Sequence, residues 1–314
     1  MANNKFSICG VAAYVPQGGI YNADRIGRFG YDPESLKSKI GVMRTTRKDA
    51  DETTSDMCVR AFEALVAKLD GALDPDSLDL IVVVTQHPDG YGLPHTSAVV
   101  HGKLGLPKTC FAFDISLGCS GYVSALATVA GHLQMAGGTR AVLITADPYS
   151  VSVSEDDKNT AMIFGDAATA TLIAPGPDWQ IGAFDFGTNG SDAEALMRTA
   201  DGVLKMDGRS VFNFCALNVP GSVTRTLERN GITKDDVDAW VMHPGSKYIV
   251  DTICKRLKIP PPATLPCINT GNTVSSSLPL ILADLDPRET PTVLVSGFGV
   301  GLGWATCILT SQPE

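Results

Sequence analysis

Charged residues are scarce in this chain: they make up 19% of its 314 residues, against roughly 25% in a typical soluble domain. The formal net charge is -9, so the chain lacks the positive footprint of a nucleic-acid-binding protein and is repelled by anionic membranes. Hydrophobic residues reach 44%, which excludes disorder and provides for a large buried core. The low charge indicates a well-covered sheet and a buried subunit interface.

Long apolar runs and paired metal-binding motifs are also missing. No run reaches the roughly 18 residues of a membrane span, and the N-terminal apolar run ends at Pro16 without a basic flank, unlike a secretory signal. We therefore expect a cytoplasmic protein that begins with a strand. The eight cysteines form no CxxC pair, and the histidines show no H-x-x-x-H spacing, so we expect no metal site. Buried free thiols are the simplest interpretation for every cysteine except Cys119.

An internal repeat organises the chain. In the first half, apolar strand patterns alternate with helix patterns, and the same order returns in the second half. The first set comprises strands 78–85, 110–118 and 140–147 with helices at 95–107 and from Ser120; the second comprises strands 237–243 and 292–299 with helices at 247–260 and 269–285, joined by a short segment that we interpret as the middle strand. Cys119 follows Pro107 by 12 positions, and Asn272 follows Pro260 by 12.

Two βαβαβ units in one chain predict an α/β fold with two parallel-rich sheets and a shared helical layer between them. We expect two halves, residues 1–175 and 176–314, divided at the loop 175–180. Sites in such sheets form beyond the carboxyl ends of strands. Cys119, His243 and Asn272 each come just after a predicted strand, so we expect them to meet at one site.

The stretch FDISLGCSGYVSAL (113–126) turns from a strand into a helix through Gly118, with Cys119 at the joint. Unpaired N–H groups make a helix start electropositive, so a thiol there is expected to have a lowered pKa and to act as a nucleophile. A structural cysteine on a crowded turn is the alternative. Asn272 could equally be a helix N-cap, and His243 before Pro244 could be a turn histidine.

Six segments of the chain resemble, in order, motifs of β-ketoacyl-acyl-carrier-protein synthase III, a condensing enzyme of the thiolase superfamily. The segments are GVAAYVP, ISLGCSGYVSAL, IFGDAATATLI, MDGRSVFNF, NTGNTVSSSLPL and SGFGVGLGWATCIL. The resemblance covers nearly the whole chain and implies a thiolase-like fold, with duplicated halves in a layered α-β-α-β-α sandwich. It also implies a homodimer in which the strand CFAFDISL (110–117) pairs or packs across the two-fold axis.

Carried over by position, the resemblance makes Cys119 the acyl-accepting nucleophile and His243 with Asn272 the pair that serves the second substrate. The backbone N–H groups of Cys119 and Val300 would form the oxyanion hole. Further positions match the family's pantetheine tunnel or acyl pocket: Lys39, Lys158, Arg209, Ser246, Lys247 and Phe298 for the tunnel, and Leu93 for the pocket of the partner subunit.

The chain departs from the family pattern at the tunnel mouth. Relatives carry H-Q-A-N and then an arginine where this chain reads His243-Pro244-Gly245-Ser246-Lys247-Tyr248. Lys39 and Lys158 stand where relatives carry arginine, and a tryptophan near IGVMR is missing. We therefore expect the pantetheine arm to be held as in the family and the nucleotide or carrier protein to be held differently. Leu93, smaller than an aromatic gate, favours acyl groups longer than acetyl.

Three functions are compatible with these residues. The first is decarboxylating condensation of an acyl-CoA, or an acyl carrier thioester, with malonyl-CoA or malonyl acyl carrier protein. The second is transfer of the Cys119-bound acyl group to an alcohol or amine in secondary metabolism or surface-glycan decoration. The third is a silent partner subunit, against which the retention of Cys119, His243 and Asn272 argues. Coenzyme A or phosphopantetheine thioesters are expected as substrates, with no permanently bound cofactor.

Overall fold

The computed structural model describes residues 6–261 and 267–311. Within them nine strands form one mixed sheet in the order β11-β12-β13-β8-β1-β7-β6-β4-β5. These strands are β1 (Ser7–Tyr14), β4 (Leu80–Val84), β5 (Phe111–Ile115), β6 (Ala141–Ala146), β7 (Ala168–Ala174), β8 (Trp179–Thr188), β11 (Ala239–Met242), β12 (Thr292–Gly299) and β13 (Gly303–Thr310).

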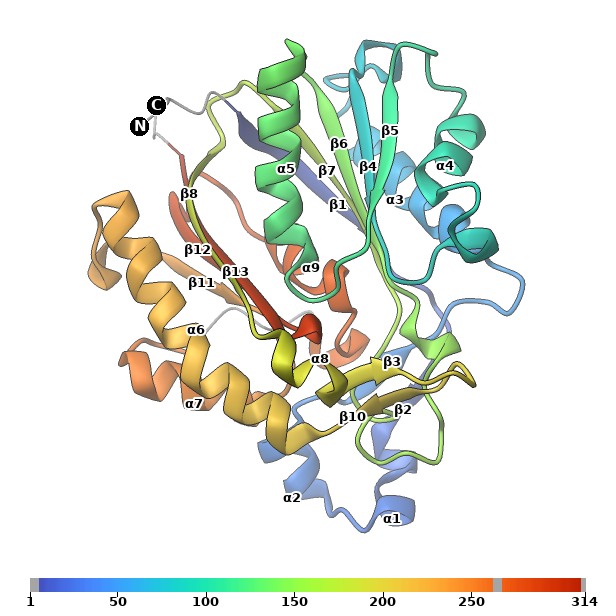
Figure 1. Ribbon diagram of the computed structural model, residues 1–314, viewed down its shortest axis with the longest axis vertical. Helices are drawn as coiled ribbons and strands as arrows, with labels where there is room; N and C mark the ends of the chain where they lie inside the picture. Colours follow the sequence, from blue (N-terminus) through green and yellow to red (C-terminus); the bar gives the residue numbers. More distant parts are fainter. Residues whose placement is uncertain (1–5, 262–266, 312–314) are drawn as a thin grey trace.

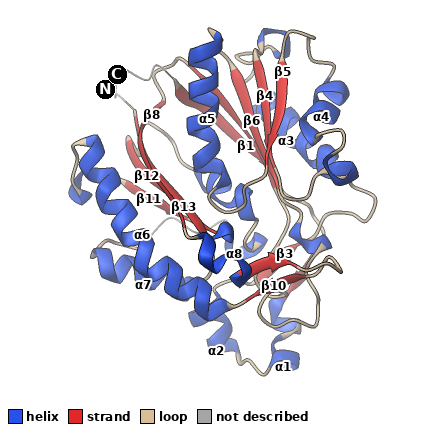
Figure 2. Cartoon of the chain, viewed as in Figure 1, coloured by secondary structure: helices blue, strands red, loops and turns tan. Residues whose placement is uncertain are grey.

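Two short antiparallel pairs lie together at the lower end of the molecule in Figure 1: β2 (Gly19–Tyr21) with β3 (Arg44–Thr46), and β9 (Leu196–Arg198) with β10 (Leu204–Met206). The helices are α1 (Ile26–Phe29), α2 (Pro33–Ser35), α3 (Thr54–Lys68), α4 (Thr96–Leu104), α5 (Gly121–Ala136), α6 (Gly208–Asn230), α7 (Lys247–Leu257), α8 (Cys267–Thr270) and α9 (Ser277–Leu282). Figure 2 separates them from the strands by colour.

The first half follows the predicted order. All five residues of β4 are buried, and β4 runs parallel to both β5 and β6. Helix α4 joins β4 to β5, and α5 joins β5 to β6. Gly105 ends α4 in the left-handed conformation, as the pattern predicted. The expected strands and helices of this half are therefore confirmed, with bounds shorter by a few residues.

The second half repeats β11, α7, α9 and β12, with β11 parallel to β12. The middle strand predicted between the two helices falls largely on residues 262–266, which lie outside the described residues. From Cys267 the chain forms the short helix α8 instead of a strand. The proposed division at residue 175 coincides with the loop between β7 and β8 and stays a prediction.

Where the sequence predicted two parallel-rich sheets, the structure has one mixed sheet. Strands β1, β7, β8 and β13 run antiparallel to the strands beside them. Among the described residues, strands β1 and β8 pair at Ser7 with Gln180 and at Ile8 with Trp179. This junction joins the two wings of the sheet (Figure 1). Period-2 apolar patterns cannot reveal it, because the pairing depends on register between strands distant in sequence.

Helices fill the space between the wings and cover their outer faces. Helix α5 contacts β4 and β6 of one wing and β12 and β13 of the other, and α9 lies beside it (Figure 1). Helix α3 contacts β1, β6 and β7 from outside, while α6 contacts β8, β12 and β13. The molecule is therefore an α-β-α-β-α sandwich, and the predicted shared helical layer is confirmed.

The core explains why β4 is apolar throughout. Leu80, Val82 and Val84 pack into the cluster between the wings, whereas Ile81 and Val83 pack into the cluster under α3 and α4. A strand covered on both faces has no solvent side, so alternation disappears. None of the helices among the described residues has the length and apolar character needed to cross a membrane.

Candidate active site

Cys119 lies in the turn between β5 and α5, and close backbone approach builds its surroundings. A side chain at Gly118 would collide with Gln86 and Val300. At Gly299, where β12 ends with φ 152°, a Cβ atom would lie 2.8 Å from the Cys119 sulfur. Glycine at these two positions therefore lets the end of β12 pack directly against the thiol.

The thiol is buried, with 3% of Cys119 exposed. Burial raises its pKa to about 12, while hydrogen bonds from the backbone of Val300 and of Cys119 itself lower it, and the charge of Asp147 raises it. The expectation of a lowered pKa for Cys119 was therefore wrong, because loss of water around the sulfur outweighs these opposing hydrogen bonds. Those same two backbone groups are the predicted oxyanion donors, and they point at the sulfur.

A cavity of about 510 Å³ opens beside Cys119. The predicted site residues that line it are Cys119, Lys158, Arg209, His243, Ser246, Asn272 and Phe298. Its apolar wall includes Phe164, Leu196, Val211 and Cys215. Residues from both halves of the chain thus meet at one cavity. Cys119 and His243 follow β5 and β11, as predicted, whereas Asn272 follows the short helix α8 and not a strand.

His243 follows β11 and is held by a hydrogen bond from its backbone N–H to the carbonyl of Ser296 at 2.9 Å. Its ring meets Phe298 edge-on, with centroids 5.8 Å apart. Both ring nitrogens are buried and have no partner among the described residues. Burial lowers the pKa of His243 to about 3, so the imidazole is neutral near pH 7 and offers one donor and one acceptor.

Asn272 supports its own turn and also lines the cavity. Its Oδ1 accepts a hydrogen bond from the backbone N–H of Val274 at 2.8 Å, which forms an Asx turn. The N-cap residue of the 3₁₀ helix that follows is Thr273, so Asn272 is not the helix N-cap that sequence offered as an alternative. The bond to Val274 orients the amide so that Nδ2 is the free end, and no described residue accepts a hydrogen bond from it. Because Asn272 also lines the cavity, its amino group is available to a bound molecule.

The mouth of the cavity is aromatic and cationic. Phe212 and Tyr248 stack there with ring centroids 5.1 Å apart and an interplanar angle of 22°. Lys158 and Arg209, both exposed, line the same mouth. Such a surface suits a planar ring and phosphate groups. The stacked pair is missing from the sequence interpretation because it joins α6 to α7.

The remaining predicted residues lie outside this cavity. Lys247 borders a neighbouring cleft of about 430 Å³, which also includes Ser246, and forms an ion pair with Asp251 at 2.8 Å. Lys39 is exposed beside Ile40, a residue of both cavities. Leu93 is 87% exposed and does not line this cavity. No cluster of metal-ligating side chains occurs within the described part of the chain.

Two family models match the chain. The model described as 3-oxoacyl-(acyl-carrier-protein) synthase III matches residues 113–190, and the model of the C-terminal part of the same enzyme matches residues 227–311. The chain is 32% identical to beta-ketoacyl-(acyl-carrier-protein) synthase III of Streptococcus pneumoniae over 321 residues, which cover 96% of this chain and 97% of that protein.

Solved structures show the same likeness. The 3-oxoacyl-(acyl-carrier-protein) synthase of Burkholderia xenovorans LB400 superposes with a TM-score of 0.88 at 31% identity, covering 98% of this chain and 94% of the other. The priming beta-ketosynthase of the R1128 polyketide biosynthetic pathway superposes with a TM-score of 0.88 at 26% identity, covering 98% and 97%. The similarity therefore spans the whole fold, including both wings of the sheet.

Proposed function

Because the chain belongs to the 3-oxoacyl-(acyl-carrier-protein) synthase III family, we propose that it condenses an acyl thioester with a malonyl thioester, with release of carbon dioxide. One observation carries this proposal: Cys119, His243 and Asn272 line a single cavity although they come from three separate chain segments. The three side chains supply a nucleophile and two neutral donors, which are the groups that such a condensation needs.

The first half-reaction forms an acyl-enzyme on Cys119. The sulfur attacks the carbonyl carbon of an acyl thioester, the new S–C bond forms, and the carrier sulfur leaves with the thiol proton. The carbonyl oxygen becomes negative in the tetrahedral intermediate. The backbone N–H groups of Cys119 and Val300, which lie at the sulfur, are placed to hold that oxygen. Exclusion of water from the buried thiol also protects the acyl-enzyme from hydrolysis.

The second half-reaction uses His243 and Asn272. A malonyl thioester loses its carboxylate as carbon dioxide, and the electrons of that C–C bond pass into an enolate. The neutral imidazole and the Nδ2 amino group each donate a hydrogen bond to the enolate oxygen. The enolate carbon then attacks the acyl carbon on Cys119, and the released thiolate regains a proton. Because burial lowers the pKa of His243 to about 3, this donor keeps its neutral form throughout the physiological range.

The substrates enter through the aromatic and cationic mouth. We expect the pantetheine arm of an acyl-CoA or a carrier protein to pass Phe298 and Ser246, with Lys158 and Arg209 near its phosphate groups. Tyr248 offers a stacking surface where relatives carry an arginine, which favours a nucleotide ring at this position over a carboxylate of a carrier protein. No permanently bound cofactor is needed for either half-reaction.

We further propose a homodimer that buries the edge strand β5. Phe111 on β5 is 54% exposed and stacks on His132 of α5 at 5.5 Å. In such a dimer Leu93 of one subunit would border the acyl site of the other, where its small side chain leaves room for groups longer than acetyl. Transfer of the acyl group to an alcohol or amine is not favoured, because the named relatives are synthases.

The test is a two-step incubation followed by mass spectrometry of enzyme and product. Labelled acetyl-CoA should add an acetyl group to Cys119, and a longer acyl-CoA series should locate the preferred chain. After addition of malonyl-CoA or malonyl acyl carrier protein, the labelled acyl group should leave Cys119 and appear in a 3-oxoacyl product, with release of carbon dioxide. Cys119→Ala should carry no label. Labelling at another cysteine, or acyl transfer to an alcohol without carbon dioxide release, would refute the proposal.

A further inference from the structure

Asp147, directly after β6, is a buried carboxyl group without a cation. It is 0% exposed and takes part in no salt bridge among the described residues. Its Oδ1 accepts the backbone N–H of Gln86 at 2.6 Å, and its Oδ2 accepts the Ser275 hydroxyl at 2.5 Å and the Ser275 N–H at 3.4 Å. Burying a carboxylate without a cation costs free energy of folding. We therefore ask which segments of the chain its hydrogen bonds join.

Those segments flank the nucleophile turn from two sides. Gln86 follows β4, and Ser275 belongs to the short 3₁₀ helix Val274–Ser276 that begins two residues after Asn272. A Cβ atom built on Gly118 would lie 2.6 Å from Gln86 Oε1 and 3.3 Å from Val274 Cγ1. Through its hydrogen bonds, Asp147 therefore connects the two segments that pack closely against Gly118, the residue before Cys119.

The turn after Asn272 has a backbone conformation that needs external support. Val274 adopts φ 56° and is fully buried, although a β-branched residue rarely enters the left-handed region. Hydrogen bonds inside the turn, including Val274 N–H to Asn272 Oδ1, hold part of it. The bonds to Asp147 tie the rest to the sheet. A strained backbone conformation persists only where the surrounding structure holds it in place, and such conformations are common at functional sites.

We propose that Asp147 is a positioning residue for decarboxylation, which holds the Asn272 turn against the nucleophile turn so that Asn272 Nδ2 meets the enolate oxygen. The inference rests on the proposed condensation. Asp147 does not line the cavity and touches no reacting atom, so it acts through Ser275 and Gln86. Acylation of Cys119 does not need Asn272 and should depend on Asp147 much less.

The ionised form of Asp147 accepts all three hydrogen bonds, whereas the protonated form must turn one oxygen into a donor. Burial raises its pKa to about 6. The titratable groups on which its charge acts are Cys58 of α3, Cys119 and Tyr149, all acids. His243, with a pKa of about 3, and Cys119, with a pKa of about 12, do not titrate between pH 5 and 8. An acidic limb near pH 6 would therefore report Asp147.

The main experiment compares Asp147→Asn with wild type in each half-reaction. Single-turnover acylation by acetyl-CoA is followed by mass spectrometry, and carbon dioxide release from malonyl-CoA is followed on the acylated enzyme. We expect decarboxylation to fall about tenfold to a hundredfold, as for a small misplacement of a reacting group, with acylation within about threefold. Wild-type decarboxylation should decline below about pH 6, and the variant should lose this dependence, because Asn does not titrate.

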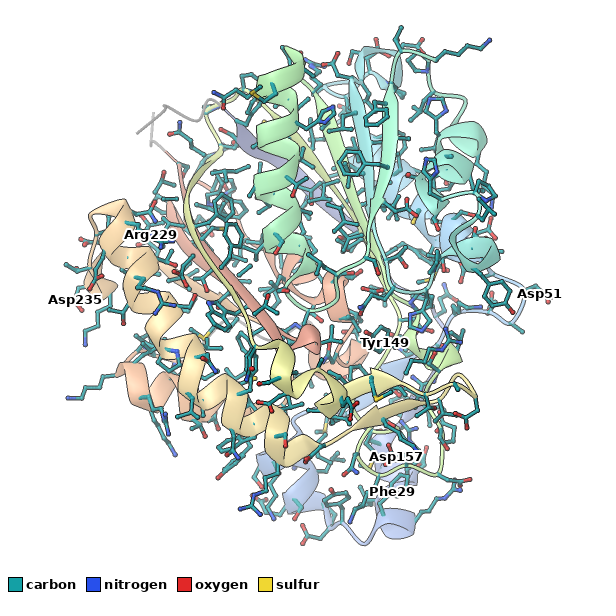
Figure 3. The ribbon with its side chains drawn as sticks, in the orientation of Figure 1. Phe29, Asp51, Tyr149, Asp157, Arg229 and Asp235 are labelled. Carbon is teal, nitrogen blue, oxygen red and sulfur yellow. The ribbon has the colours of Figure 1, made fainter. Side chains whose placement is uncertain are left out.

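Asp185→Asn is the matched control. Asp185 on β8 is also a buried carboxyl group, 2% exposed, but it binds Arg225, Arg229 and Trp304 and does not line the cavity. In Figure 3 Arg229 lies at the outer end of α6, well away from Tyr149, which is two residues after Asp147. This control should lower stability while leaving the ratio of the two half-reaction rates and the pH profile unchanged.

Equal loss in both half-reactions, or no loss, would overturn the role of Asp147. If Asp147→Asn does not fold, Ser275→Ala replaces it: removal of the hydroxyl that donates at 2.5 Å should still lower decarboxylation selectively, and an unchanged ratio would overturn the inference. A wild-type enzyme that releases no carbon dioxide from any malonyl donor would refute the condensation and this inference together. If wild type releases carbon dioxide but Asp147→Asn shows no selective loss of decarboxylation, only the role of Asp147 is refuted.

Discussion

Asn272 supports the turn with its oxygen and offers its nitrogen as a donor, and the two atoms can be tested separately. Asn272→Ala removes both. Asn272→Asp keeps an oxygen for the Val274 N–H, which now donates at 2.8 Å, and replaces the amino group with a second oxygen. The two variants differ in the hydrogen bond to Val274 and share the loss of the amino group, so a defect that both show is assigned to the lost donor.

The structure sets the expected magnitudes. Losing a side-chain hydrogen bond costs about 1 kcal/mol of folding stability, so the alanine variant should be destabilised by about that amount, while the aspartate variant keeps the bond to Val274. Losing one preorganised donor to a developing oxyanion costs about a hundredfold to a thousandfold in rate, or about 3 to 4 kcal/mol of transition-state stabilisation. In both variants the rate of carbon dioxide release should therefore fall by at least about two orders of magnitude.

The assay separates acylation from decarboxylation. Acylation by labelled acetyl-CoA should remain nearly intact in Asn272→Ala, because the oxyanion donors for that step are the backbone groups of Cys119 and Val300. Carbon dioxide is then collected after addition of malonyl-CoA to the acylated enzyme, and chemical denaturation gives the stability of each variant. Should Asn272→Asp decarboxylate at the wild-type rate, Asn272 would serve only to support the turn and the donor assignment would fail.

Three further outcomes are expected. Burial holds the pKa of His243 near 3, so folding stability should be lost as the pH falls below the unfolded value of about 6.5; at pH 5 this costs about 2 kcal/mol, and His243→Gln should show a correspondingly smaller loss of Tm between pH 7 and 5. Alanine at Lys158 or Arg209 should raise the KM for acetyl-CoA severalfold with little change in kcat, an effect that high salt reproduces in wild type; an unchanged KM would remove these cations from the substrate path. Phe111→Asp should convert the expected dimer into a monomer by light scattering, whereas a wild-type monomer at micromolar concentration would refute the interface.

Sequence predicted the residues of the site because its main signals are local. Gly118, Cys119 and the small residues that follow stand at a strand-to-helix turn that period changes reveal. His243 was found for the same reason, since it comes after a strand and parallel strands end at one edge. Asn272 was also expected after a strand, but in the structure it follows the short helix α8. The layered arrangement followed from the repeated order of strands and helices, and it is confirmed by the contacts of α3, α5 and α6.

Tertiary structure decided the protonation of the site residues and how the segments of the chain lie relative to one another. The helix start predicted a lowered pKa for Cys119, but burial from every side raises it to about 12, and burial is a property of the packed molecule. The free end of the Asn272 amide is known only because Val274 N–H occupies Oδ1. The junction of β1 and β8 likewise depends on register.

The amino-acid sequence by itself determined the alternating strands and helices, the duplicated order and the places of Cys119 and His243 after strand ends, because side-chain period, glycine positions and caps act within a few residues. Only the tertiary structure decided which groups lose water, which polar groups meet and how the wings join. The bond between Asp147 and Ser275 spans 128 positions, and no local pattern encodes a contact that exists only after the two halves pack together.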